Sequence, residues 1–230
     1  FIQRTYDQLS QDLCIDSNPA TILVQTASVN GMTDVTHIGI FDIPMISNIP
    51  NLVYIAPTTK EDYLAVLDWS IEQTDYPVAI RVPVAELVST GKPCTKNFAE
   101  LNKYEVAQQG GKIAVIALGS FYGMGEQAAK LIEEKTGTAP TLINPYYITG
   151  VDTELLESLK KGHDVVVTLE DGVLDGGFGE KIARFYGPSD VKVINFGLKK
   201  EFIDRYNPAD VLKENRLTPE QIAEDAVALI

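Results

Sequence analysis

The chain contains only two histidines, and one of them, His37, lies in the segment DVTHIGIFD at residues 34–42. Asp34 stands three residues before it, and Phe41 and Asp42 follow shortly after. Because imidazole titrates near neutral pH, a histidine in a polar loop beside a carboxylate is suited to general acid–base chemistry. Taken alone, His37 is equally compatible with a loop residue that caps a turn.

The position of His37 relative to the expected strands favours the chemical role. TILVQTA (21–27) has the composition of a strand, and the loop that carries His37 leaves the carboxyl end of that strand. Open α/β sheets bind their ligands at the carboxyl ends of parallel strands. We therefore expect His37 to be catalytic.

Other residues with chemical potential have structural explanations. His163 precedes the expected strand at 164–171, where a turn residue is expected, and Glu170 and Asp171 end that strand, where we expect solvated carboxylates. The segment DGVLDGGFGE (171–180) lacks the GxGxxG spacing and the GKS or GKT ending of phosphate-binding loops. Its glycines are expected instead to let the chain turn from a strand into a helix.

Strands and helices are expected to alternate along most of the chain. Short apolar runs predict strands, and apolar residues spaced three and four apart predict helices. The expected strands are 21–27, 52–57, 78–83, 112–119, 141–148, 164–171 and 191–197, and the expected helices are 1–14, 43–49, 60–74, 125–137, 152–162, 177–187 and 218–230. In the helix at 60–74, Leu64, Leu67 and Ile71 share one face.

This alternation predicts an α/β protein of two domains, each with a mostly parallel sheet covered by helices. The first domain is expected at 1–85 and the second at 112–230. The polar stretch 86–111 has few apolar runs and ends in Gly-Gly, so we expect it to connect the domains, with room for one short strand.

Composition excludes several classes of partner and site. The chain has 230 residues, a net charge of −13 and a pI near 4.5, whereas binding to nucleic acids or anionic membranes needs clustered Lys and Arg. It has no apolar run of membrane-spanning length and no signal-peptide pattern. Cys14 and Cys94 form no CxxC motif, so we expect neither a zinc site nor a disulfide framework. These features favour a cytoplasmic protein without a metal site of its own.

Several segments, in the same order and at similar spacing, resemble a family of thiamine-diphosphate enzymes. FIQRTYDQ and THIGIFD…IPN…AP, followed by VAIRVP, resemble the pyrimidine-binding module of the 1-deoxy-D-xylulose-5-phosphate synthases, which is similar to that of transketolases. VTLEDGVLDGGFGEKIARF and VINFGL resemble the C-terminal domain that follows this module. The resemblance covers nearly the whole chain. It implies a partial pyrimidine-binding module at 1–85 and a transketolase C-terminal domain at 112–230.

The resemblance also implies roles for individual residues. Phe1 matches an aromatic residue that stacks on the aminopyrimidine ring of the cofactor, and Arg4 matches an arginine of the same helix. His37 matches the histidine that faces the substrate and shuttles protons. The loop aspartate of the family aligns with Thr33, and Asp34 is its neighbour, so both are expected near the substrate.

Two positions depart from the family in a way that concerns the aldehyde acceptor. The synthases hold the phosphate of this acceptor with two arginines, and this chain has Thr26 and Val84 at those positions. Arg81, in VAIRVP, is retained and is expected to bind substrate. Each lost charge-assisted contact removes about 1.5–3 kcal/mol of binding free energy, because neither Thr nor Val supplies the charge of a bidentate arginine. We therefore expect an acceptor that is non-phosphorylated or differently held.

The activity implied by the resemblance is that of a transferase acting on 2-oxo acids. Such an enzyme decarboxylates pyruvate or another 2-oxo donor on thiamine diphosphate and transfers the product carbanion to an aldehyde or sugar, as in isoprenoid biosynthesis. The resemblance implies a homodimer, and it implies Mg²⁺ whose ligands are expected upstream of Phe1. The chain begins without Met and its first helix without a cap, so we expect a fragment that is inactive by itself. Three alternatives stay open: a transketolase, the β-type subunit of a 2-oxo-acid dehydrogenase, and a non-catalytic domain that stabilises a dimer.

Overall fold

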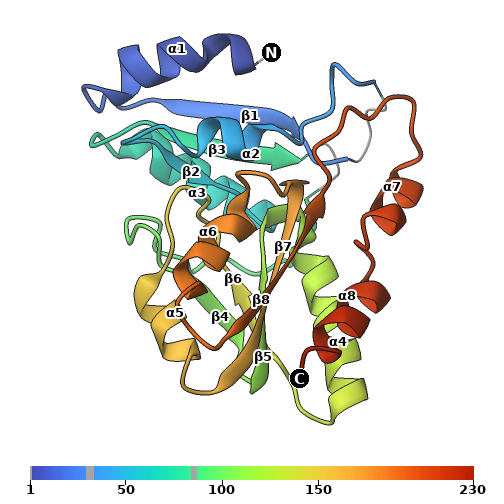
Figure 1. Ribbon diagram of the computed structural model, residues 1–230. Coiled ribbons are helices and arrows are strands. Elements are labelled where there is room, and N and C mark those ends of the chain that lie inside the picture. Colours follow the sequence, from blue (N-terminus) through green and yellow to red (C-terminus); the bar gives the residue numbers. More distant parts are fainter. Residues whose placement is uncertain (1, 30–33, 84–86) are drawn as a thin grey trace.

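The computed structural model describes residues 2–29, 34–83 and 87–230 (Figure 1). It contains two sheets with helices packed against them, so the α/β architecture expected from the sequence is confirmed. No helix within these ranges is both long enough and apolar enough to cross a bilayer.

The first sheet has three parallel strands in the order β1-β3-β2. They are β1 (Thr21–Ala27), β2 (Val53–Ile55) and β3 (Val78–Pro83). β3 lies between the other two and pairs in parallel with both. All three strands therefore end at the same edge of the sheet, where the His37 loop leaves β1.

Helical segments precede and connect these strands. Thr59 starts the longest of them with a reciprocal capping box, in which its hydroxyl and the Asp62 carboxylate each accept a backbone amide proton of the other residue. The segments are Ile2–Thr5 (3₁₀), α1 (Tyr6–Gln8), Leu9–Cys14 (π-helix), α2 (Asp42–Ile46) and α3 (Lys60–Glu72).

The predicted apolar face of α3 is only partly buried. Leu64 is 48% exposed and Ile71 is 65% exposed, whereas Ser70 is buried. The Ser70 hydroxyl lies 3.0 Å from that of Thr21 on β1. Val66, one turn before Ser70, is fully buried in an apolar cluster with residues of β2 and β3, and Leu67 packs partly against the same cluster. The sequence predicted the helix, but the face that packs on the sheet is centred on Val66 and Ser70.

The second sheet has five strands in the order β4-β6-β5-β7-β8. Strands β6, β5, β7 and β8 run parallel to one another, and the edge strand β4 pairs antiparallel with β6. β4 lies within the stretch 86–111, which was expected to connect the domains and to have room for one short strand. That strand is present, and it belongs to the second sheet. The bounds are β4 (Glu105–Gln108), β5 (Lys112–Ala117), β6 (Thr141–Asn144), β7 (His163–Val173) and β8 (Lys192–Leu198).

Helices cover both faces of the second sheet (Figure 1). Successive side chains of β5 point to opposite faces of the sheet. Ile113 and Val115 join the apolar cluster of α4 and α8, while Ala114 and Ile116 join that of α5 and α6. The bounds are Gly119–Phe121 (3₁₀), α4 (Tyr122–Thr136), α5 (Thr153–Leu159), α6 (Phe178–Tyr186), α7 (Pro208–Glu214) and α8 (Pro219–Val227). α7 was not predicted from the sequence, although Asn207 and Pro208 form a regular helix start.

The first sheet lies across the carboxyl end of the second (Figure 1). The backbones join directly, because the Ala56 amide donates to the Tyr146 carbonyl and the Ile148 amide donates to the Tyr54 carbonyl, both at 2.8 Å. One buried apolar cluster contains residues of both sheets, including Val24 of β1 and others from β5 and β7. The two halves therefore share part of one core.

Candidate functional site

His37 is held by a chain of hydrogen bonds that starts at Asp34. The Thr36 hydroxyl donates to a carboxylate oxygen of Asp34 at 2.5 Å, and the same hydroxyl oxygen lies 2.8 Å from Nδ1 of His37. Because the hydroxyl gives its only proton to the carboxylate, its oxygen is left to accept a proton from Nδ1. The basic lone pair of the ring is therefore on Nε2. The Thr36 hydroxyl and then the Thr36 amide lower the pKa of Asp34, which keeps this carboxylate ionised.

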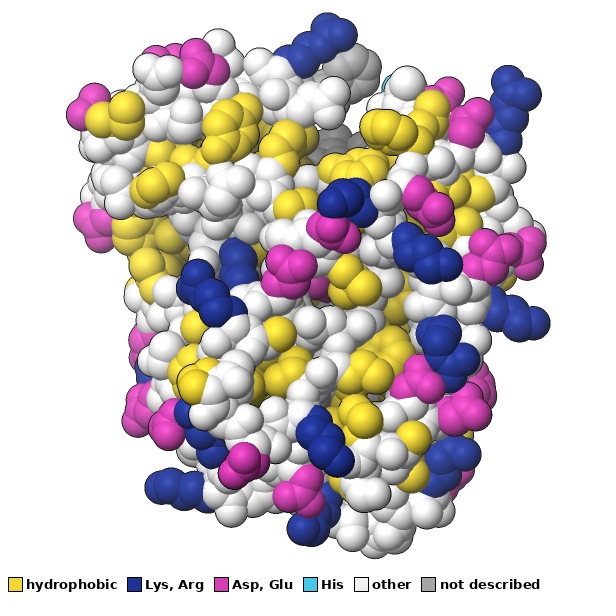
Figure 2. Space-filling model, in the orientation of Figure 1, with side chains coloured by type: hydrophobic (Ala, Val, Ile, Leu, Met, Phe, Trp, Pro, Cys, Tyr) yellow, Lys and Arg dark blue, Asp and Glu magenta, His cyan; other side chains and the backbone are white. Residues whose placement is uncertain are grey.

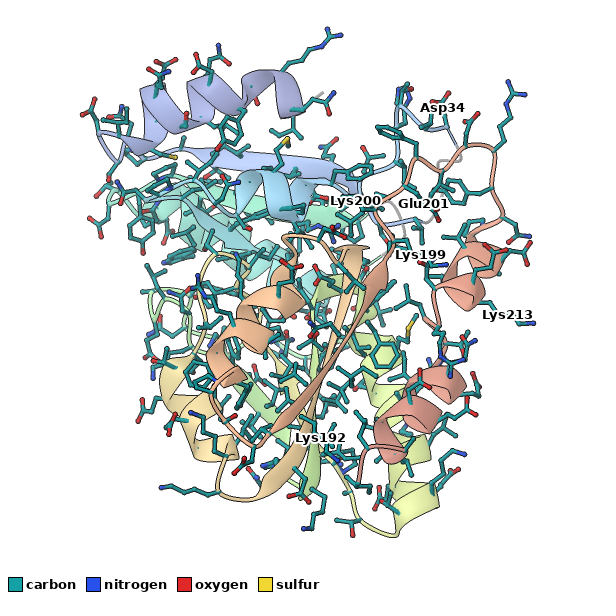
Figure 3. The ribbon with its side chains drawn as sticks, viewed as in Figure 1. Asp34, Lys192, Lys199, Lys200, Glu201 and Lys213 are labelled. Carbon is teal, nitrogen blue, oxygen red and sulfur yellow. The ribbon has the colours of Figure 1, made fainter. Side chains whose placement is uncertain are left out.

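The His37 loop is exposed and rests on the C-terminal half of the chain. The His37 side chain is 41% exposed, so it is accessible from solvent. The Val35 amide donates at 3.2 Å to the carboxylate of Asp204, which belongs to the segment between β8 and α7. Figure 3 shows Asp34 on the same side of the molecule as this segment.

The base of the loop has an unusual backbone. The Ser28 amide donates to the Gly39 carbonyl at 2.9 Å, and a Cβ atom at Gly39 would lie 2.0 Å from the Thr26 carbonyl oxygen. Thr26 and Ser28 have φ angles of +66° and +83°, values that are uncommon for residues other than glycine. The Ser28 hydroxyl is buried and finds no hydrogen-bond partner among residues 2–29, 34–83 and 87–230. Strained backbone and unsatisfied buried groups are typical of functional sites.

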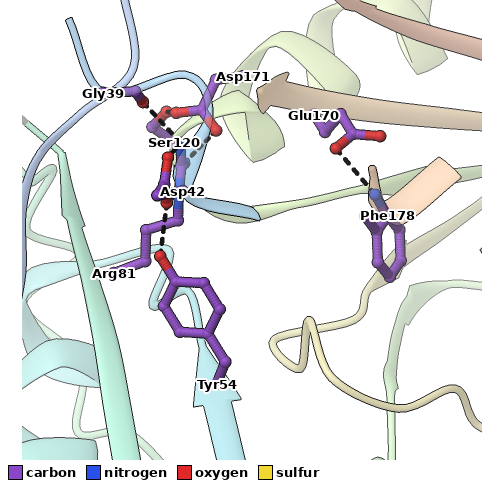
Figure 4. Close-up of polar contacts among 8 residues, drawn as sticks. All are labelled: Gly39, Asp42, Tyr54, Arg81, Ser120, Glu170, Asp171 and Phe178. Carbon is purple, nitrogen blue, oxygen red and sulfur yellow. Dashed lines mark hydrogen bonds and ion pairs between the residues drawn. The ribbon is translucent and has the colours of Figure 1, made fainter. Parts of the chain in front are cut away.

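Arg81 lies beneath this loop and is 2% exposed (Figure 4). Its Nε donates to Asp42 at 2.6 Å, its Nη1 pairs with Asp171 of β7, and its Nη2 donates to the Gly39 carbonyl at 3.2 Å. Burial alone would lower the pKa of Arg81, but Asp171 and Asp42 more than offset burial, so its pKa is raised well above the ordinary value. Each nitrogen of the guanidinium is engaged, which disfavours the substrate contact expected for Arg81. The side chain instead ties the base of the His37 loop to the second sheet.

The Arg81 site coincides with the place where the second sheet would ordinarily bind a ligand. The connection after β5 leads to β6 on one side of β5, whereas the connection after β6 leads to β7 on the other side. The strand order therefore reverses between β5 and β7, and this is the topological switch point of the sheet. Ser120, just after β5, donates its hydroxyl to Asp171 at the end of β7, at 2.6 Å. The guanidinium of Arg81 pairs with Asp171 at this point. In this chain a buried ion pair between the two halves therefore occupies the switch point.

Glu170 and Asp171 are fully buried, so the expectation of solvated carboxylates is wrong. The Glu170 carboxylate accepts the amide protons of Phe178 and Gly179, at 2.9 and 2.8 Å, and so caps the start of α6 (Figure 4). Burial raises the pKa of Glu170 to about 7, and its hydrogen bonds and Arg81 only partly oppose this shift. A Cβ atom at Gly177 would lie 2.6 Å from a carboxylate oxygen of Glu170, which supports a structural role for the glycine-rich segment.

The remaining predicted residues are distributed as follows. Arg4 is exposed in the 3₁₀ segment, which packs against α2, the helix after the His37 loop. Phe1, Thr33 and Val84 lie outside the described residues. His163 is not a turn residue: it is buried at the start of β7, with its ring nitrogens 2.7 Å from a hydroxyl of β6 and 3.0 Å from a carbonyl of α5.

The residues that position others were not predicted from the sequence. Thr36 is one of them, although the Asp-x-Thr pattern before His37 is a known turn-forming arrangement. Ser28 and Ser120 are two more, and neither belongs to a motif. Asp42 was noticed as a neighbour of His37, but only the fold shows that it pairs with Arg81.

Comparison with known proteins gives matches in both halves. Residues 102–222 match the family described as transketolase, C-terminal domain, and residues 1–89 match the transketolase pyrimidine binding domain. Curated relatives named 1-deoxy-D-xylulose-5-phosphate synthase include those of Clostridium tetani, 33% identical over 232 residues, and Symbiobacterium thermophilum, 34% identical over 236 residues. These alignments cover 100% of this chain but only 37% and 35% of those relatives.

Solved structures agree on the fold. A split-gene transketolase, solved as an inactive beta4 tetramer, matches with a TM-score of 0.84 at 20% identity, over 98% of this chain and 71% of that chain. A transketolase mutant from Pichia stipitis matches with a TM-score of 0.69 at 19% identity, over 92% of this chain and 30% of that chain. With the C-terminal domain match alone covering more than half of the sequence, the chain belongs to the transketolase family.

Proposed function

We propose that this chain supplies the pyrimidine-binding and C-terminal domains of a thiamine-diphosphate-dependent transferase of the 1-deoxy-D-xylulose-5-phosphate synthase type. Such an enzyme decarboxylates pyruvate or another 2-oxo acid and transfers the remaining fragment to an aldehyde. The observation that carries the proposal is the exposed, oriented imidazole of His37 at the carboxyl end of β1. Alignment of the whole chain with synthases of that name supports it.

His37 is the acid–base group of this proposal. Its Nε2 lone pair accepts a proton from a substrate hydroxyl and returns it at a later step, while Thr36 holds Nδ1 protonated. Asp34 in turn orients Thr36. Thr33, the neighbour of Asp34, is proposed beside the substrate on the resemblance alone.

The cofactor is proposed to lie over the same edge of the first sheet. Thiamine diphosphate supplies the electron sink that makes decarboxylation possible. Arg4 and Phe1 are the residues proposed beside its pyrimidine ring, and the unpartnered Ser28 hydroxyl is a further polar group at this edge. The described part of the chain has no cluster of three or more metal-binding side chains. We therefore assign the Mg²⁺ and diphosphate ligands to the part of the enzyme that the relatives carry outside the aligned region.

The acceptor aldehyde is proposed to be non-phosphorylated or differently held. Thr26, at the strained base of the loop, stands where the synthases have an arginine that binds the acceptor phosphate, and threonine cannot supply that charge. Arg81 cannot substitute in this arrangement, because its guanidinium is buried in ion pairs.

The test uses the complete enzyme, meaning this chain together with the diphosphate-binding part of its relatives. We expect it to release CO₂ from pyruvate and to prefer glyceraldehyde to glyceraldehyde 3-phosphate by kcat/KM. Efficient use of the phosphorylated aldehyde would defeat the proposal about the acceptor. Failure to decarboxylate any 2-oxo acid would defeat the proposed function.

A His37→Ala variant separates an enzyme from a scaffold. Loss of a general acid–base group lowers kcat by about 10²–10⁴-fold. Unchanged turnover, with the dimer intact by light scattering, would instead support a domain that only stabilises the assembly.

A transketolase is the second candidate. The split-gene transketolase is matched over 71% of its length, a larger share than for the curated synthases. A transketolase moves a two-carbon ketol unit between sugars without releasing CO₂, and a 2-oxo-acid dehydrogenase releases CO₂ without needing an aldehyde. Measuring CO₂ release with and without aldehyde therefore separates the three activities.

We further propose a homodimeric, cytoplasmic enzyme. Cys14 and Cys94 are free thiols, as a reducing compartment favours. Size-exclusion chromatography with light scattering on the complete enzyme tests the dimer.

A further inference from the structure

A separate cleft lies between the β6–α5 loop and α6. It has a volume of about 230 Å³ and is lined chiefly by Thr149, Thr153, Lys181, Arg184 and Phe185. One liquid water occupies about 30 Å³, so the cleft has room for a tetrahedral anion with several waters. A larger cavity of about 460 Å³, lined by uncharged polar and apolar residues, shares Thr149 and Gly150 with it.

Two cations line this cleft without an acidic partner. Lys181 is half-buried, and its Nζ donates to the Ile148 carbonyl at 2.6 Å. Neither Lys181 nor Arg184 forms an ion pair with any carboxylate in the described part of the chain. The chain has a net charge of −13, so carboxylates are abundant, and yet none of those described pairs with these two cations. Figure 2 shows basic side chains exposed where α6 lies in Figure 1.

The electrostatics of Lys181 support an anion site. Its pKa is lowered to about 8, chiefly by burial and further by the charge of Arg184, while the Glu170 carboxylate only partly offsets these effects. An anion bound between the half-buried Lys181 and the exposed Arg184 would relieve both the burial of the first cation and the repulsion between the two.

The other lining groups complete the set of donors. The Thr149 hydroxyl oxygen already accepts the Tyr54 amide proton at 3.2 Å, so its own proton is available to a ligand. Phe185 supplies an apolar wall, and Lys160 lies 4.7 Å over the centre of its ring. A phosphate group carries enough negative charge to pair with both cations, and its oxygens can also accept hydrogen bonds from one or two hydroxyls.

We propose that this cleft binds a small phosphorylated molecule through its phosphate, held by Lys181 and Arg184. The site does not depend on the proposed function, because binding needs neither thiamine diphosphate nor the diphosphate-binding part.

Inorganic phosphate is the probe for the test. It is titrated into the 230-residue chain and into the complete enzyme at constant ionic strength, with chloride as reference, while amide NMR shifts are followed. Shifts should concentrate at 149–153 and 181–185, and Arg184→Ala should weaken phosphate binding about tenfold. Lys181→Met keeps the packed stem and should have a similar effect. Lys213→Ala, an exposed lysine on α7, is the matched control and should bind as the wild type does.

Two results would overturn the proposal. One is an equal affinity of wild type and Arg184→Glu for phosphate, since this exposed position has no described partner whose loss would unfold the chain. The other is a set of shifts that chloride reproduces at the same ionic strength. Either result leaves the activity of the complete enzyme, and thus the proposed function, unaffected.

Discussion

At the residue scale, Thr36 determines which nitrogen of His37 is basic. Its hydroxyl donates to Asp34 and therefore accepts from Nδ1. Without that hydroxyl, Nδ1 loses the hydrogen bond that fixes its proton, so the tautomer with the proton on Nε2 becomes accessible. The catalytic role proposed for His37 is thus coupled to the hydroxyl of its neighbour Thr36.

Thr36→Val tests this coupling, because valine has the shape of threonine without the hydroxyl. We expect kcat of the complete enzyme to fall about tenfold with KM nearly unchanged, since only the orientation of the base is disturbed. Thr36→Ser restores the hydroxyl and should retain most of the activity. Equal kcat values for the Val and Ser variants would contradict the relay.

Glu170 is the second residue whose chemistry depends on its surroundings. Its pKa is raised from 4.5 to about 7 by burial, so the folded state holds its proton more tightly than the unfolded chain does. The resulting stabilisation is fully present below the unfolded pKa and is lost as the pH rises through about 7.

Glu170→Gln therefore changes the pH dependence of stability. Between about pH 5 and about pH 8, the wild type should lose roughly 2–3 kcal/mol more unfolding free energy than the variant. Urea denaturation at the two pH values measures both slopes. Parallel slopes would show that Glu170 does not titrate in this range.

At the element scale, α6 depends on glycines at its start. The Glu170 carboxylate reaches the first amides of the helix only because no side chain stands at Gly177. The first amides of α6, in this glycine-rich segment, are therefore already bound by a carboxylate of the same chain. The α3 helix makes a related point, since sequence periodicity identified the helix but not which of its faces packs on the sheet.

Gly177→Ala should destabilise the fold by roughly 1–3 kcal/mol, because its Cβ would lie 2.6 and 2.7 Å from the two Glu170 oxygens. Gly123→Ala, within α4, is the matched control, since its Cβ would meet nothing within 4 Å. That change should stabilise the fold by about 0.5–1 kcal/mol. Thermal unfolding of both variants tests the contrast, and similar Tm values for the two would refute it.

At the scale of the whole molecule, the carboxyl ends of the two sheets meet at Arg81. Asp42 from the first half and Asp171 from the second share its guanidinium, and Tyr54 and Ser120 donate hydroxyl protons to these carboxylates. This network connects the base of the His37 loop to β7. Loss of the arginine would leave two buried carboxylates without a counter-ion.

Arg81→Met should therefore lower the free energy of unfolding by about 3–5 kcal/mol. Arg216→Met removes a surface arginine that also contacts two acids, and it should change stability little. Chemical denaturation compares the two variants. A small effect at Arg81 would mean that apolar contacts alone hold the halves together.

The sequence by itself determined the α/β class, the parallel strands and the position of His37 after β1. These features are encoded locally, because strand and helix periodicity and loop placement depend on residues near one another in the chain. Short runs such as TILVQTA and KEDYLAVLDWSIE carry that information without help from distant residues. The family resemblance added the expected roles of His37 and Arg4.

Only the tertiary structure decided which polar groups meet. Arg81 and Asp171 are 90 residues apart, and no spacing in the sequence shows that they form a buried pair at the junction of two sheets. The same holds for the burial of Glu170 and for the cleft that Lys181 and Arg184 share with Thr149. The environment of a charged group is set by whichever distant segments pack around it, and packing is a property of the whole chain.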